Sequence, residues 1–225
     1  MLRLYLQEPA MTPARIRYQT IEFDHLDIHL RSLLDKQQFS DPFGVAEDLG
    51  ISSAQWSLFG VLWESGEMLA REMQSFEIQG KRILEVGCGM ALPSLLLNAR
   101  HADITATDYH PEAGPYLAEN VKLNHGRGIP FLRTNWDLDT DNLGTFDVII
   151  GADLLYERNH SDKLSAFIDR HANPHCEVIV IDPCRSSKSS FSKKMMTLGF
   201  SFSEIKKTVA TLKKDFSANV LSFVR

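Results

Sequence analysis

The stretch that decides the fold is KRILEVGCGMALPSLLLNARHADITATD, residues 81–108. It opens with an apolar strand, Arg82–Val86, and passes through a turn that contains glycines. A helix then opens at Pro93, in the first helical position that proline favours, and runs over Ser94–Arg100. A second apolar strand, Ile104–Asp108, follows. This order predicts a parallel βαβ unit, because a crossover helix returns the chain to the start of the neighbouring strand.

Strand and helix patterns continue to alternate along most of the chain after this unit. The expected strands are Phe131–Asn135, Phe146–Asp153, Glu177–Asp182, Phe200–Val209 and Asn219–Val224, and the expected helices run from near Ser65 to just before Gly80, from Pro111 to Asn124, over Ser161–His171 and over Ser189–Leu198. No helix pattern separates the last two strands, which predicts an antiparallel pair there. We therefore predict an α/β, Rossmann-like fold: a seven-stranded, mostly parallel sheet with an antiparallel last strand and helices on both faces.

The first 55 residues do not follow this alternation. Residues 16–34 hold two apolar runs around Asp24-His25, typical of a short hairpin or of a strand followed by a helix. Residues 37–53 have the glycines and proline of a loop. We expect residues 1–55 to form an N-terminal extension that packs on a main domain of residues 56–225.

The spacing of the glycines in the first turn distinguishes two classes of adenosine-bearing cofactor. A dinucleotide site needs a third glycine three residues after the second, and Leu92 stands at that position after Gly87 and Gly89. With Glu85 the run reads E-x-G-x-G-x-A, which is the variant associated with S-adenosylmethionine. The turn therefore favours S-adenosylmethionine as the cofactor and makes an oxidoreductase the least favoured enzyme class.

Polar residues follow the next strands at the edge where a ligand of such a sheet binds. Asp108 is expected to accept the two ribose hydroxyls. Asn135, Trp136 and Asp137 offer an amide, an apolar face and a carboxylate to an adenine, and Asp153 lies beside the methyl group. Each has a structural alternative: Asp108 as a helix cap, Trp136 as a core residue and Asp137 as solvated surface.

The acceptor side is marked by Asp153-Leu154-Leu155-Tyr156, directly after the strand FDVIIGAD. Here the chain resembles a known family, the seven-stranded protein methyltransferases with a D/E-x-x-Y/F motif, which modify lysines and, in some relatives, other side chains. Three segments carry the resemblance: Leu62–Gly66, Glu85–Ala91, and the run from Trp136 to Tyr156. Together they lie within residues 56–160, and the resemblance makes residues 56–225 a methyltransferase domain.

The resemblance implies roles for four residues. Trp63 would cover the cofactor, Trp136 would contact the adenine, and Asp153 and Tyr156 would shape the acceptor pocket. The expected reaction is methyl transfer to a nitrogen of a protein substrate, most simply a lysine. Asp153 would orient the amine by hydrogen bonding, and Tyr156 would offer a π-face to a cationic nitrogen. The alternative for this pair is that Asp153 caps a helix and Tyr156 only packs.

Two other functions stay open at this stage. One is methylation of a small amine or heteroaromatic nitrogen, as in nicotinamide-type methyltransferases, and the other is a non-catalytic protein that binds S-adenosylmethionine. Arg185, in Asp182-Pro183-Cys184-Arg185, faces the same edge. Its guanidinium is expected either to hold a substrate carboxylate or backbone, or to pair with Asp182.

The composition limits the partners. A net charge of −5 over 225 residues argues against general nucleic-acid binding, which usually needs a basic face. No apolar run approaches the roughly 18 residues that span a bilayer, so no membrane association is expected. Three cysteines without C-x-x-C spacing indicate free thiols and a cytoplasmic location, and the histidines lack metal-ligand spacing, so no metal site is expected. The sequence carries no signal for an oligomeric state.

Overall fold

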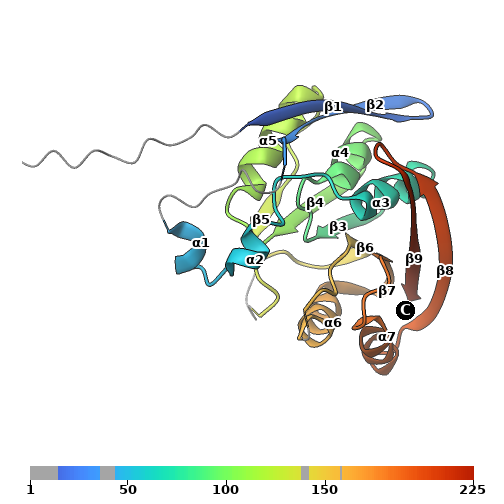
Figure 1. Cartoon of the computed structure of the whole chain (residues 1–225). Coiled ribbons are helices and arrows are strands. Elements are labelled where there is room, and N and C mark those ends of the chain that lie inside the picture. Colours follow the sequence, from blue (N-terminus) through green and yellow to red (C-terminus); the bar gives the residue numbers. More distant parts are fainter. Residues whose placement is uncertain (1–14, 36–43, 138–141, 158) are drawn as a thin grey trace, which may run out of the picture.

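The computed structural model describes residues 15–35, 44–137, 142–157 and 159–225. A seven-stranded sheet with the order β5-β4-β3-β6-β7-β9-β8 forms its centre (Figure 1). The strands are β3 (Arg82–Val86), β4 (Asp103–Asp108), β5 (Phe131–Arg133), β6 (Phe146–Ala152), β7 (Ala172–Asp182), β8 (Ser201–Ala210) and β9 (Asp215–Val224). The five strands from β3 to β7 are parallel, whereas β9 runs antiparallel to both β7 and β8. The predicted sheet is confirmed.

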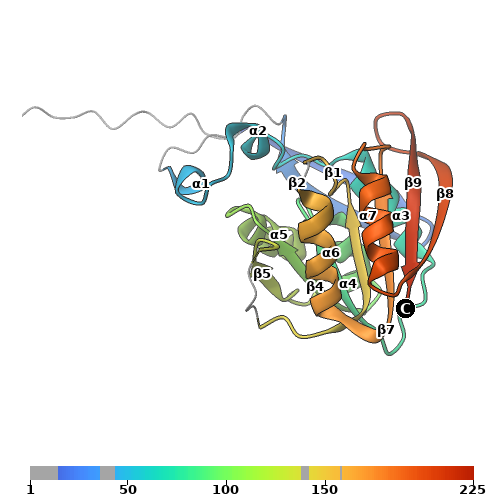
Figure 2. The ribbon, with the colours of Figure 1, turned by 90° about the horizontal axis from the view of Figure 1, so that it is seen from below.

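Helices cover both faces of the sheet, also as predicted (Figures 1 and 2). One face carries α3 (Glu64–Gln74), α4 (Leu92–Ala99) and α5 (Ala113–Leu123), and the other carries α6 (His160–His171) and α7 (Lys188–Thr197). Successive residues of β3 serve opposite faces: Ile83 packs with the first set of helices and Leu84 with the second, and both are fully buried. Burial on both faces explains the continuous apolar run of this strand.

The order of the strands creates the site. β3 pairs with β4 on one side and with β6 on the other, so the chain reverses its direction of winding between β3 and β6. Ligands of open α/β sheets bind beyond the carboxyl ends of the strands at such a switch point. The glycine turn after β3, Asp108 at the end of β4 and Asp153 after β6 therefore meet at one edge.

The N-terminal segment forms a hairpin, which was one of the two alternatives. β1 (Ile16–Phe23) and β2 (Leu26–Leu33) pair antiparallel around Asp24-His25 and lie over α5 (Figure 1). The amides of Asn120, in the last turn of α5, and of Asn124, its C-cap residue, bind the outer edge of β2. Asn124 Oδ1 accepts from the His29 N–H at 2.8 Å, and Asn120 Oδ1 accepts from the Arg31 N–H at 2.7 Å. Each amide also donates to the carbonyl of the same residue, so the pair replaces a neighbouring strand.

Several predicted boundaries are wrong. The loop prediction for residues 37–53 fails at the short helix α1 (Val45–Asp48) and at the start of α2 (Ser53–Trp56), while residues 37–43 lie outside the described residues. β5 ends at Arg133, so Asn135 lies two residues beyond the strand. β7 begins at Ala172, directly after α6, and β9 extends to Asp215 because its first residues pair only with β8.

The helix predicted to run almost to Gly80 ends at Gln74. Its end is fixed from outside by Arg100, whose guanidinium donates to the carbonyls of Met73 at 2.5 Å and Phe76 at 2.8 Å. These bonds satisfy acceptors that a longer helix would have used. Among the described residues, no helix combines the length and the apolar character that crossing a membrane requires.

Candidate cofactor and acceptor site

The glycine turn after β3 depends on two glycines for different reasons. Gly87 (φ +62°) and Gly89 (φ +51°) both adopt the left-handed conformation that favours glycine. A Cβ on Gly87 would lie 2.6 Å from Cδ2 of Leu154, whereas a Cβ on Gly89 would meet no atom within 4 Å. Gly87 therefore allows the acceptor motif to pack on the turn, and Gly89 leaves its backbone open to a ligand.

Glu85 holds the turn from below. It is buried, and its Oε2 accepts hydrogen bonds from the backbone N–H of Ser94, at 2.9 Å, and from the Ser94 hydroxyl. These bonds tie the end of β3 to the first turn of α4. Burial raises the pKa of the Glu85 carboxyl to about 8, although the bonds from Ser94 act in the opposite direction.

Asp108 connects the end of β4 to the same turn. Its Oδ2 accepts from the Gly89 N–H and its Oδ1 from the His110 N–H, both at 2.8 Å. Burial raises the pKa of Asp108, and the hydrogen bonds from the backbone oppose that rise. Asp108 does not cap the next helix, because α5 begins at Ala113 with Glu112 as its N-cap residue.

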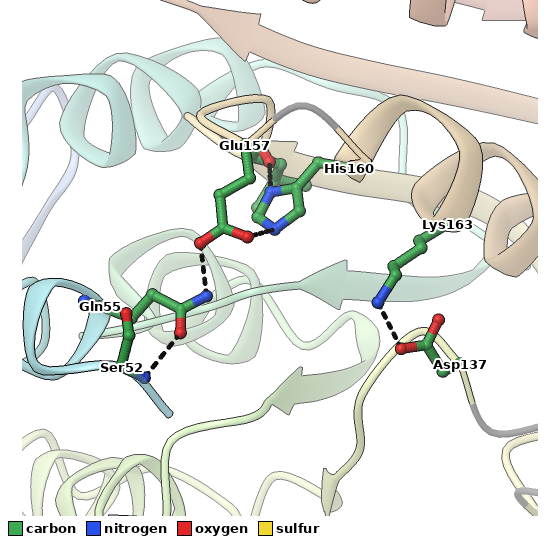
Figure 3. A network of polar contacts seen from close by, with 7 residues as sticks. Ser52, Gln55, Asp137, Glu157, His160 and Lys163 are labelled. Carbon is green, nitrogen blue, oxygen red and sulfur yellow. Dashed lines mark hydrogen bonds and ion pairs between the residues drawn. The ribbon is translucent and has the colours of Figure 1, made fainter. Parts of the chain in front are cut away.

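The three residues after β5 have different environments. Oδ1 of Asn135 is buried and has no hydrogen-bond partner among the described residues. Trp136 is half-buried and packs against the core under α6, with its ring edge-on to His160 at 5.0 Å. Asp137 is exposed and forms an ion pair with Lys163 of α6 (Figure 3). Asn135 therefore keeps a free acceptor in this group, while the carboxylate of Asp137 is engaged.

An aromatic cluster that the sequence did not reveal lies beside Asp108. The ring of His110 stacks on Phe59 with 4.1 Å between centroids and contacts Trp56 at 4.5 Å. The predicted Trp63 belongs to the same segment, at the N-cap of α3, and its Nε1–H donates to the Leu58 carbonyl at 2.9 Å. The segment from α2 to the start of α3 thus lies over the edge where β4 ends.

The acceptor motif folds back onto the sheet at a strained residue. Asp153 has φ +54°, and its N–H donates to the Ile181 carbonyl of β7 at 2.8 Å. Leu154 and Leu155 are buried, while Tyr156 is 43% exposed. The motif therefore anchors itself through its leucines and presents its acid and its phenol at the edge.

The guanidinium of Arg185 binds Asp153. Nε donates to Oδ1 at 2.7 Å and Nη2 donates to Oδ2 at 2.8 Å. The partner expected from the sequence was a substrate group or Asp182, and the predicted pairing of the side chain with Asp182 is wrong. Asp182 accepts instead from the backbone N–H of Arg185 at 3.0 Å, which leaves the side chain to reach Asp153.

His160 connects Trp136 to the loop that holds Tyr156 and Glu157, and Figure 3 shows its ring facing Glu157. Its ring lies edge-on between Trp136 and Tyr156, at 5.0 and 4.6 Å between centroids. Nδ1 lies 2.7 Å from the Leu154 carbonyl, and Nε2 lies 3.3 Å from a carboxylate oxygen of Glu157. No pattern in the sequence singled out this histidine, because its contacts combine the loop that precedes it with Trp136 of a separate segment.

Glu157 links this cluster to α2. Its second carboxylate oxygen accepts from Nε2 of Gln55 at 2.6 Å (Figure 3). Together with Asp108 and Asp153, Glu157 surrounds Tyr156 with negative charge. Burial, reinforced by these carboxylates, raises the pKa of Tyr156 to about 12, so the phenol stays neutral at physiological pH.

Comparison with known proteins decides the family. A family model described as lysine methyltransferase matches residues 45–198, more than half of the 225-residue chain. The chain belongs to the lysine methyltransferase family. Protein N-lysine methyltransferase METTL21A of Danio rerio is 30% identical over 138 residues, which cover 56% of this chain and 63% of that protein. The electron transfer flavoprotein beta subunit lysine methyltransferase of Mus musculus is 29% identical over 145 residues, covering 63% and 55%.

The chain thus spans 55% to 63% of the length of these two relatives.

Solved structures show the same fold at lower identity. A methyltransferase from Pyrococcus furiosus matches with a TM-score of 0.60 and 22% identity, covering 81% of this chain and 98% of that one. The 16S rRNA N2 G1207 methyltransferase of T. thermophilus, in complex with AdoMet and guanosine, matches with a TM-score of 0.64 and 14% identity, covering 95% and 52%.

The two glycines of this family member give a first prediction. Gly87→Ala should lower the free energy of unfolding by about 1–2 kcal/mol for the left-handed backbone and by a further ~1–3 kcal/mol for the clash with Leu154. Gly89→Ala is the matched control, because it carries the backbone cost without the clash. Urea denaturation of both variants measures the difference, and equal losses would contradict the packing of Leu154 on Gly87.

Glu85 gives the stability an unusual dependence on pH. Its pKa rises from 4.5 to about 8 on folding. Between these values the folded chain holds a proton that the unfolded chain has released, so this group makes the free energy of unfolding fall as the pH rises. Glu85→Gln has no such proton and should remove a slope of at most about 1.4 kcal/mol per pH unit. Denaturation curves from pH 5 to 8 measure it; parallel trends for the two chains would refute the assignment.

Proposed function

We propose that the chain is an S-adenosylmethionine-dependent methyltransferase that transfers a methyl group to a nitrogen, most simply a lysine amine, of a protein substrate. The observation that carries this proposal is the contact between Gly87 and Leu154, which brings the glycine turn and the D-x-x-Y motif against each other. A methyl donor on the turn and an acceptor at the motif would then be neighbours, and proximity supplies much of the rate in a displacement reaction. Membership of the lysine methyltransferase family supports the same reading.

The residues at the edge fit the proposed cofactor. The buried Oδ1 of Asn135, without a partner among the described residues, suits the amino group of an adenine. Asp108 would accept ribose hydroxyls in the acceptor directions that the N–H groups of Gly89 and His110 leave open, and the open space over Gly89 suits the methionine portion. Trp136 and Trp63 would cover the rings, while Glu85 would act by holding the turn.

When bound, S-adenosylmethionine supplies a methyl group on a positively charged sulfur. The chain's own task is to deliver the acceptor nitrogen with its lone pair free and pointing at that methyl group. Asp153 would accept an N–H of the amine and so fix the direction of the lone pair. Tyr156, neutral and partly exposed, would offer the face of its ring to the nitrogen.

Three further expectations, on location, nucleic-acid binding and domain division, belong to the same proposal. We infer a cytoplasmic location, since all three cysteines are free thiols. We also infer that the chain is not a general nucleic-acid binder, on the ground of its net charge. The division into an N-terminal extension of residues 1–55 and a methyltransferase domain of residues 56–225 is likewise proposed.

The direct test is incubation of a cell extract with the purified chain and radiolabelled S-adenosylmethionine. We expect the label in a protein, on lysine, and identification of the labelled residue by mass spectrometry. Label in a small amine would favour the nicotinamide-type alternative. No labelled product together with binding of S-adenosylhomocysteine would indicate a non-catalytic binder, and no binding at millimolar ligand would refute the proposal.

Asp108 and Asp153 should separate cofactor binding from turnover. Asp108→Asn removes the charge that would bind the ribose and should weaken affinity for S-adenosylhomocysteine by about 10- to 100-fold, the loss typical of a hydrogen bond to a charged group. Asp153→Asn makes the same chemical change at the acceptor, so affinity should hold while turnover falls by roughly 100-fold. Calorimetry and label transfer measure the two effects. Wild-type affinity in Asp108→Asn would remove Asp108 from the ribose site.

A further inference from the structure

We propose that Arg185 is a positioning residue that balances the charge of Asp153, so that the acceptor lysine binds as a neutral amine rather than as an ammonium ion. This inference rests on the proposed function and adds to it the protonation state of the incoming acceptor. It follows from one contact, the two-point ion pair between Arg185 and Asp153.

The geometry of the pair is specific. The two nitrogens Nε and Nη2 of one guanidinium edge each donate to a separate oxygen of Asp153, at 2.7 and 2.8 Å. This side-on arrangement fixes the carboxylate plane and occupies one acceptor direction on each oxygen. The other directions remain open for an N–H of an amine. The side chain of Asp153 is 19% exposed and that of Arg185 is 44% exposed, so an acceptor can reach the pair from solvent.

The loop that carries Arg185 is built to present it. Asp182 at the end of β7 accepts the backbone N–H of Arg185 from both carboxylate oxygens, at 3.0 and 3.3 Å. Cys184, just before it, takes a left-handed conformation with φ +68°. The loop thus turns sharply after β7 and directs the guanidinium across to the loop after β6.

The charged groups near the Arg185–Asp153 pair are mostly acidic, so the positive charge of Arg185 matters for the acceptor. Burial and the charge of Asp153 raise the pKa of Asp182 at the end of β7, while the charges of Asp108 and Glu157 add to the burial that raises the pKa of Tyr156. Asp182, Asp108 and Glu157 are acidic, and Tyr156 itself is neutral. Arg185 is the cation that touches Asp153, and its own pKa is raised by the hydrogen bonds to that carboxylate. Without it, the acceptor would enter a site in which Asp153 has no contacting cation among the described residues, because Lys188, which acts on Asp182, forms its ion pair with Glu204.

A site of this kind would favour the ammonium form of the acceptor lysine over the neutral amine. A carboxylate without a counter-ion stabilises an ammonium and raises its pKa, and an ammonium has no lone pair to attack with. A carboxylate that is already paired with a guanidinium still accepts an N–H but gains little from a second cation. The lysine lone pair then forms the N–C bond while the C–S bond breaks and its electron pair stays on sulfur. The positive charge moves to the methylammonium product, which the guanidinium repels and helps to release.

The test is the pH dependence of kcat, which reports ionisation in the enzyme–substrate complex. The acceptor is the extract protein that takes the label in the experiment above, purified and used at saturation. In Arg185→Gln the acid limb of the profile should move to higher pH by roughly one to two units, the effect of one charge at this range. KM should fall, because the ammonium form now binds. Arg185→Lys keeps the charge, so most of this shift should be absent and the profile should lie close to that of the wild type.

Lys188→Gln is the matched control. It removes one positive charge from the start of the helix that follows the same loop, but Lys188 pairs with Glu204 instead of Asp153. Its profile should overlie that of the wild type, and all three variants should keep the wild-type affinity for S-adenosylhomocysteine. An equal shift in Lys188→Gln would overturn the inference, because any nearby charge would then suffice.

Two other results would also overturn it. A raised KM with an unshifted profile in Arg185→Gln means that Arg185 holds a carboxylate of the substrate. A raised kcat with an unshifted profile means that the ion pair only obstructs the pocket. Both results leave the proposed function intact, since the wild type is active. If the wild type transfers no label to any protein, the proposed function fails first and the inference falls with it.

Discussion

The site depends on the packing of the Leu154 side chain against Gly87 and Gly151. A Cβ on Gly87 would lie 2.6 Å from Leu154, and a Cβ on Gly151 would lie 2.5 Å from the other methyl group of the same residue. Gly87 directly follows β3 and Gly151 is the last residue but one of β6, at the switch point of the sheet where Val86 pairs with Gly151. Leu154 can therefore keep its present rotamer and place only if both positions lack side chains. Its burial fixes Asp153 and Tyr156, on either side of it along the chain, at the carboxyl edge.

The second feature of the site is the set of partners that its acidic side chains have. Carboxyl groups from several segments gather at this edge, and they have different partners. Glu85 is buried under the turn and keeps a raised pKa, Asp108 is held by backbone N–H groups, and Asp153 is paired with Arg185. Glu157 joins His160 to α2. Buried or crowded acids need such partners, and the choice of partner decides which acid is left to meet a ligand.

The sequence predicted most of the sheet and the meeting of the glycine turn, Asp108 and Asp153 at one edge, because both depend on local patterns. The turn after β3 and Asp108 lie within one βαβ unit, and Asp153 directly follows a strand. Contacts between distant segments were missed, since no periodicity records them. Arg185 lies 32 residues from Asp153, and Gln55 lies 102 residues from Glu157. The end of α3 was also misplaced, because Arg100 of another helix sets it.

Leu154 holds the glycine turn and the D-x-x-Y motif against each other, and we propose that a methyl donor and its acceptor meet there. A crystal structure of the chain with bound S-adenosylhomocysteine is the sharpest test. We expect ribose hydroxyls within about 3 Å of Asp108, the adenine amino group on Oδ1 of Asn135, and the sulfur facing Asp153. Ligand bound elsewhere, or a sulfur turned away from Asp153 behind the buried Leu154, would contradict this proposal.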